Sequence, residues 1–115
     1  MKSNDRLLIG SICFAAALAT AYAEELPPQA VMKKFGEFKA SPNATLGAKL
    51  RHCSKAERQV FEVSESGGFT GTTIIFDQQG NQLYQENWSD TGTGTSEGEK
   101  IDLRTFNCKD AEPQG

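Results

Sequence analysis

The residues that come closest to a catalytic pattern lie in "WSDTGTGTSEGE", residues 88–99, where Asp90 is followed by threonine and glycine. An aspartate acts as a general acid and base when it shares a proton with a second aspartate, and both must be held in a buried, rigid setting. Asp90 instead follows Asn-Trp-Ser and opens a run of Gly, Thr, Ser and Glu without any apolar residue. We therefore expect an exposed polar loop over residues 89–100.

Asp-Thr-Gly is also the tripeptide that carries the catalytic aspartate of pepsin-like and retroviral aspartic proteases, and the chain resembles that motif at Asp90. The family places bulky apolar residues before the motif, where this chain has Asn-Trp-Ser. It also has a later apolar-apolar-Gly segment, whereas here Asn-Cys follows "IDLRTF". The resemblance implies a hydrolase that acts through Asp90, and this is the third hypothesis for the function.

Other catalytic and metal-binding patterns lack their essential partners. His52 is the single histidine, and it stands beside Cys53 without a C-x-x-C pair or a second cluster of ligands, as a zinc site would need. No serine lies in a G-x-S-x-G turn. The sequence therefore predicts no catalytic residue, no metal site and no cofactor, and we expect that the protein is not an enzyme.

The first 23 residues have the pattern of a secretory signal peptide. Lys2 and Arg6 precede the apolar run "LLIGSICFAAALATA", which is short for a membrane span, and Ala-Tyr-Ala at residues 21–23 forms a cleavage site. We expect a periplasmic or secreted protein that is soluble and has no membrane association after cleavage.

Cysteine usage agrees with export. Cys13 is expected to leave with the signal peptide, and Cys53 and Cys108 remain. Two cysteines in an exported chain are most simply explained by one disulfide. This bond is predicted to fasten the last strand to the segment before the first clear strand.

Charge is divided unevenly along the predicted mature chain. Residues 24–58 hold seven Lys or Arg and four Asp or Glu, a net charge of +3, whereas residues 59–115 hold three and ten, a net charge of −7. A net acidic chain argues against a nucleic-acid partner, because nucleic-acid binders carry a basic surface. The acidic second half would suit a basic protein partner.

The remaining pattern predicts an α+β fold with one N-terminal helix packed on a four- to five-stranded antiparallel meander, closed by one disulfide. The helix is expected in "PQAVMKKFGEFKA", whose apolar residues form one stripe. The clearest hairpin is "TTIIFDQQGNQLYQENW", with strands also at "QVFEVSE" and at residues 101–108. Residues 46–58 fit a helix or a strand, and we favour a short strand ending near Cys53.

The predicted organisation has four parts. A signal peptide covers residues 1–23, and a mobile entry with an amphipathic helix covers residues 24–45. A disulfide-closed β-rich domain covers residues 46–110, and a disordered tail covers residues 111–115.

These features favour a small exported binding module, such as an inhibitor of a protease or of a lysozyme-like hydrolase. Loops on a rigid sheet commonly carry the contacts of such proteins. The candidate binding residues are Phe69 in "SGGFTG", and Trp88 and Asp90 beside the predicted polar loop. The outline of a helix over a meander resembles cystatin-type inhibitors, although "QVFEV" does not match their Q-x-V-x-G loop.

The alternative is an accessory or structural subunit of a periplasmic complex. In that case the apolar stripe of the helix would dock on a partner instead of on the chain's own sheet. The sequence does not fix the oligomeric state.

Overall fold

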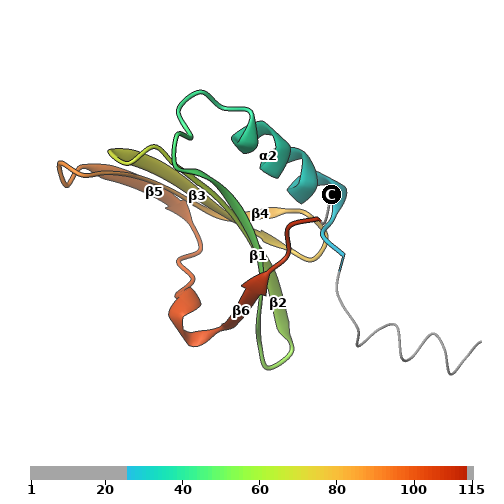
Figure 1. Ribbon diagram of the computed structural model, residues 1–115. Coiled ribbons are helices and arrows are strands. Elements are labelled where there is room, and N and C mark those ends of the chain that lie inside the picture. The colour runs from blue at the N-terminus through green and yellow to red at the C-terminus, as the bar shows by residue number, and fades with distance from the viewer. Residues whose placement is uncertain (1–25, 114–115) are drawn as a thin grey trace, which may run out of the picture.

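A computed structural model describes residues 26–113, which form one α-helix, one short 3-10 helix and one six-stranded antiparallel sheet (Figure 1). The strands lie in the order β5-β4-β3-β2-β1-β6. The predicted signal peptide lies outside the described residues, as do the last two residues of the predicted tail. The elements are α2 (Gln29–Lys39), β1 (Gly47–Lys55), β2 (Arg58–Ser66), β3 (Thr70–Asp77), β4 (Gln82–Ser89), β5 (Gly94–Gly98), the 3-10 helix η1 (Leu103–Thr105) and β6 (Asn107–Asp110).

Helix α2 covers one face of the sheet through the apolar stripe that the sequence predicts (Figure 1). Val31 and Phe35 are fully or almost fully buried against the sheet. The carbonyl of Pro28 accepts from the N–H groups of Val31 and Met32, so the helix begins directly after this proline. The stripe belongs to a core cluster with side chains from β1, β2 and β3, namely Leu50, Phe61, Val63, Ile74 and Phe76.

A second apolar cluster lies on the opposite, helix-free face of the sheet. It contains Cys53, Val60, Ile75 and Tyr84, whose neighbours in β1, β2 and β3 face the helix. Successive side chains of a strand point to opposite faces, so these strands are apolar on both sides. We call residues 99–106, which cross this face from β5 to β6, the strap. Its side chains Ile101, Leu103 and Phe106 pack on the second cluster.

The strap corrects the prediction of a continuous last strand over residues 101–108. Asp102 instead caps the short helix η1, and only Asn107–Asp110 pairs with β1. The physical reason is that β5 and β6 lie at opposite edges of the sheet. The chain must cross the helix-free face between them, and it buries its apolar side chains on the way.

The predicted disulfide and the strand alternative for residues 46–58 are confirmed. Cys53 and Cys108 are bonded and lie directly opposite each other in the β1–β6 pair. Strand β1 continues two residues beyond Cys53 to Lys55. After β6 the N–H of Ala111 donates to the carbonyl of Leu50.

The predicted polar loop over residues 89–100 is partly wrong, because Gly94–Gly98 forms strand β5 along β4. The strand lacks apolar residues and is exposed throughout. It forms because β4 offers an unpaired edge and the glycines allow close approach. A Cβ at Gly98 would collide with the carbonyl of Leu83, and one at Gly94 would lie 2.6 Å from the carbonyl oxygen of Asn87. With β5 and β6 the sheet has six strands instead of the expected four or five.

Candidate functional site

The three candidate binding residues lie at one end of the sheet. The N–H of Asp90 donates to the carbonyl of Phe69 at 2.8 Å, and Trp88 pairs with Gly71 two residues further along the same strands. Residues 21 positions apart in the sequence are therefore neighbours. Their proximity follows from the β3–β4 hairpin, which returns the chain to the end at which β3 began.

Three connections meet at this end, and we call them together the loop apex (Figure 1). They are the α2–β1 loop (residues 40–46), the β2–β3 turn (residues 67–69) and the β4–β5 turn (residues 90–93). The N–H of Leu46 donates to the carbonyl of Ser66 at 2.9 Å, and the hydroxyl of Thr45 donates to the carbonyl of Gly67 at 3.2 Å. Together with the bond from Asp90 to Phe69, these contacts tie each connection to the next.

The loop apex carries exposed apolar side chains. Four large hydrophobic residues are exposed among residues 26–113: Leu26 (82%), Leu46 (71%), Phe69 (72%) and Trp88 (36%). Leu46 and Phe69 belong to the loop apex, and Trp88 lies just below it. Leu46 was not among the candidates from the sequence, because residues 46–58 were expected to form a short strand and not a loop. Its position between Thr45 and Gly47 was the available signal for a loop.

The β4–β5 turn is closed by its own hydroxyl groups. The Oγ of Ser89 and the Oγ1 of Thr91 lie 2.6 Å apart, and Thr93 extends the chain with 3.1 Å between its Oγ1 and that of Thr91. Gly92 has a φ of 90°, which glycine adopts without strain. Asp90 is exposed within this turn, so its setting differs from the buried one that a shared catalytic proton requires.

The ring of Trp88 lies on the backbone of β3 at Gly71, on the helix-free face. A Cβ at position 71 would collide with the indole atoms Cε2, Cζ2 and Nε1. Glycine therefore gives the indole room against the sheet. One side of the ring is covered by β3, and about a third of the residue remains exposed.

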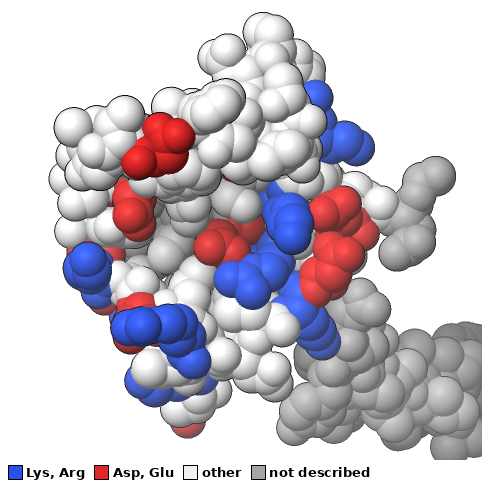
Figure 2. Space-filling view, turned by 60° about the vertical axis from the view of Figure 1, so that its left-hand side comes forward, with Lys and Arg blue, Asp and Glu red and all other residues white. Residues whose placement is uncertain are grey.

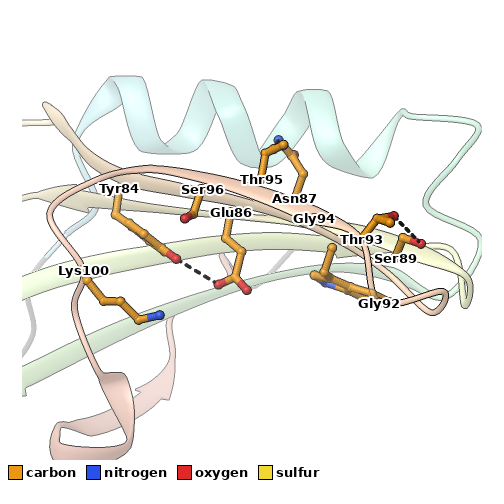
Figure 3. Close-up of a pocket in the computed structure, with 11 residues that line it drawn as sticks. Tyr84, Glu86, Asn87, Ser89, Gly92, Thr93, Gly94, Thr95, Ser96 and Lys100 are labelled. Atoms are coloured by element: carbon orange, nitrogen blue, oxygen red, sulfur yellow. Dashed lines mark hydrogen bonds between the residues drawn. The ribbon is translucent and has the colours of Figure 1, made fainter.

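A hollow of about 330 Å³ lies beside Trp88 (Figure 3). Three large side chains of β4 on this face each pair with a small residue of β5, because Trp88 lies opposite Gly94, Glu86 opposite Ser96 and Tyr84 opposite Gly98. Strand β5 thus adds nothing larger than serine on this face, which leaves the space open. The lining residues are Tyr84, Glu86, Asn87, Trp88, Ser89, Gly92, Thr93, Gly94, Thr95, Ser96 and Lys100.

Polar groups are held in place around the hollow. The hydroxyl of Tyr84 donates to Oε1 of Glu86 at 3.2 Å. Figure 3 shows this bond and places Lys100, which belongs to the strap, at the far end from Gly92. Trp88 was a candidate from the sequence, whereas Tyr84 and Glu86 were not. Their alternation with Trp88 along "YQENW" was the available signal that all three share one face.

Folding mixes the two oppositely charged halves of the chain. Arg51 pairs with Glu62 at 2.6 Å, and Arg58 pairs with Glu99 at 2.8 Å. The hydrogen bond from Arg58 lowers the pKa of the Glu99 carboxyl. Figure 2 shows basic and acidic side chains interspersed on the face that it presents. On this face, the acidic side chains therefore do not form a surface separate from the basic ones.

His52 and Cys53 do not converge. The imidazole packs on Phe61 with 5.0 Å between ring centroids, on the helix side, whereas Cys53 belongs to the cluster on the helix-free face. Within residues 26–113, no group of three His, Cys, Asp or Glu side chains is placed to hold a metal ion. In the same part of the chain, no helix is long and apolar enough to cross a membrane.

Comparison with known proteins gives no match to this chain among protein-family models, curated proteins or solved structures.

Proposed function

We propose that the protein is a small exported binding module that contacts a protein partner through the loop apex. The observation that carries the proposal is the gathering of exposed apolar side chains there. Leu46 and Phe69 come from connections 23 positions apart in the sequence, yet Cδ1 of Leu46 lies 3.7 Å from where a Cβ of Gly68, next to Phe69, would be. Clustered exposed apolar residues are typical of interaction sites.

The hydrogen bonds of the loop apex favour binding. Ordering side chains and loops at an interface costs free energy, and connections that are already tied together lose less of it. Phe69 and Leu46 would act as anchors in a pocket of the partner, with Trp88 at the border and Asp90 offering a carboxylate at the rim. A projecting end of this kind suits insertion into the cleft of a hydrolase, such as a protease or a lysozyme-like enzyme.

The disulfide supports the export part of the proposal. A bond between Cys53 and Cys108 persists in an oxidising compartment outside the cytoplasm. This agrees with the signal peptide that the sequence predicts.

The other two hypotheses receive less support. The apolar stripe of α2 is buried on the chain's own sheet at Val31 and Phe35, so it does not offer the docking surface of an accessory subunit. Hydrolysis through Asp90 would need a buried aspartate, and Asp90 is exposed. We therefore propose a non-enzymatic role.

The test is a pull-down from periplasmic and extracellular fractions with the oxidised mature chain, residues 24–115, as bait. We expect one stoichiometric partner whose capture is lost with Phe69→Ala and weakened with Leu46→Ala. Leu26→Ala is the matched control, because Leu26 is equally apolar and exposed but lies away from the loop apex. Capture that survives both apex variants, or that falls equally with the control, would disprove the role of the loop apex.

A further inference from the structure

The hollow beside Trp88 is lined by neither Leu46 nor Phe69, the two anchors of the proposed protein interaction. Gly94 and Ser96 of β5 line it, together with Trp88 of β4 and Lys100 of the strap. The strap packs Ile101, Leu103 and Phe106 on the second cluster of this face, and none of the three lines the hollow. Its volume of about 330 Å³ is near the lower end of the usual size range of small-ligand sites, about 300 Å³.

We propose that this hollow is a carbohydrate site that holds a pyranose ring of an uncharged oligosaccharide. A pyranose has one apolar face of C–H groups and a rim of hydroxyls that both donate and accept. An exposed indole offers a flat apolar surface to the C–H face at little conformational cost. The ring of Trp88 meets this need, because Gly71 and the backbone of β3 support it from behind.

The polar lining has the mixed character that hydroxyl groups require. Glu86 supplies carboxylate acceptors and Lys100 supplies ammonium donors, while Ser96 can do both. The hydroxyl of Tyr84 already donates to Oε1 of Glu86, which orients the carboxylate towards the hollow. Figure 3 shows Glu86 beside Tyr84, on the same side of the sheet as Lys100. One acidic and one basic group together favour an uncharged ligand over an ion of either sign.

The main competing ligand is a cationic side chain of a protein. Arginine or lysine would gain from Glu86 and from the π face of Trp88. Lys100 opposes this, because its positive charge lines the same hollow. A peptide that carries arginine is therefore included as a competitor in the test.

The test uses Trp88 itself, since it is the single tryptophan of the chain. The oxidised mature protein is titrated with the trisaccharides of N-acetylglucosamine, β-linked glucose and α-linked glucose, and indole fluorescence is followed. Amide chemical shifts are recorded in parallel. We expect a saturable fluorescence change with at least one trisaccharide, and shift changes confined to β4, β5 and residues near Lys100.

Two variants of neighbouring residues distinguish a loss of binding in the hollow from a general disturbance of the sheet. Ser96→Ile fills the hollow, whereas Glu97→Ile places the same side chain on the opposite face of β5, where Glu97 pairs with Gln85 and does not line the hollow. Both variants introduce isoleucine, a residue that favours strands. We expect Ser96→Ile to weaken binding about tenfold or more, a loss of roughly 1.4 kcal/mol, and Glu97→Ile to leave it unchanged.

The proposal is overturned if none of the three trisaccharides gives a saturable signal at millimolar concentration while the chain is folded. It is also overturned if both variants weaken binding equally, or if the arginine peptide binds the hollow and the sugars do not. None of these outcomes depends on Phe69 or Leu46. Failure of the carbohydrate proposal can therefore be distinguished from failure of the proposed protein interaction at the loop apex.

Discussion

The ring of Trp88 owes its position to the absence of a side chain at Gly71. Gly71→Ala would place a Cβ into the indole, and the ring would have to leave the sheet. We expect the indole emission to move to longer wavelength and the free energy of unfolding to fall by about 1–3 kcal/mol, the usual cost of overpacking. Fluorescence spectra and urea denaturation of the variant check both effects.

Gly36→Ala is the matched control for that substitution. A Cβ at Gly36 meets nothing within 4 Å, and the residue lies inside α2. Alanine is the better helix former, so we expect a gain of about 0.5–1 kcal/mol and an unchanged emission spectrum. A Gly71→Ala protein with the parent spectrum would show that Trp88 does not rest on β3.

Asp102 and Arg104 form a local charge pair at the start of η1. The hydrogen bond from the Arg104 side chain, together with the one from its backbone N–H, lowers the pKa of Asp102 to about 2. A lowered pKa in the folded state means that this carboxylate contributes stability above its ordinary pKa of 3.8, and that the contribution is lost as the pH falls towards 2. We expect NMR titration of the carboxyl group to give a midpoint near 2, and Arg104→Gln to raise it towards the ordinary value. An unchanged midpoint in Arg104→Gln would refute the pair.

At the scale of elements, the disulfide holds β6 and the strap to the sheet. Cys53 and Cys108 are separated by 55 positions, and closing a loop of that length stabilises the fold by about 4 kcal/mol in the chain-entropy model. We expect the double variant Cys53→Ala, Cys108→Ala to lose a free energy of this order in urea denaturation. Hydrogen exchange should show β6 and residues 99–106 losing protection before β2 and β3. Equal loss in all strands would mean that the disulfide stabilises the whole sheet and not this edge.

The elements that the sequence predicted best carry their own local signals. The β3–β4 hairpin is one case, because Asp77 accepts from the N–H groups of Gln79 and Asn81 at 2.9 Å, and Gly80 supplies a φ of 89°. Helix α2 is another, since its apolar stripe has the period of a helix. In both elements, the pattern that predicts the structure lies within the residues that form it.

Strand β5 and the strap were mispredicted because their structure depends on distant partners. "GTSEG" has no apolar alternation, and it becomes a strand only along the edge of β4. The apolar content of residues 101–106 predicts a strand. Because β5 and β6 lie at opposite edges of the sheet, this segment instead crosses the helix-free face. The hollow was missed for the same reason, since it exists only once Ser96 is known to lie opposite Glu86.

At the scale of the whole molecule, one sheet carries two apolar clusters. Val60 and Phe61 are adjacent in β2 but face opposite sides, as do Ile74 and Ile75 in β3. The helix closes one cluster and the strap closes the other. Because the two clusters share the same strands, neither can lose its packing without disturbing the backbone of the other, and we infer a single cooperative unit.

This inference can be tested because the two sides have separate probes. Far-ultraviolet circular dichroism reports α2 and the sheet, whereas the single tryptophan reports the helix-free face. Phe35→Leu changes only the helix side, where Phe35 is buried, and should cost about 1 kcal/mol, because the smaller side chain leaves part of the space unfilled. For a domain of this size that corresponds to a fall in Tm of about 4–8 °C. We expect the circular dichroism and fluorescence midpoints to fall together by the same amount. If the fluorescence midpoint stays at its parent value, the face that bears Trp88 unfolds independently of the helix, and the hollow belongs to a unit held by the strap alone.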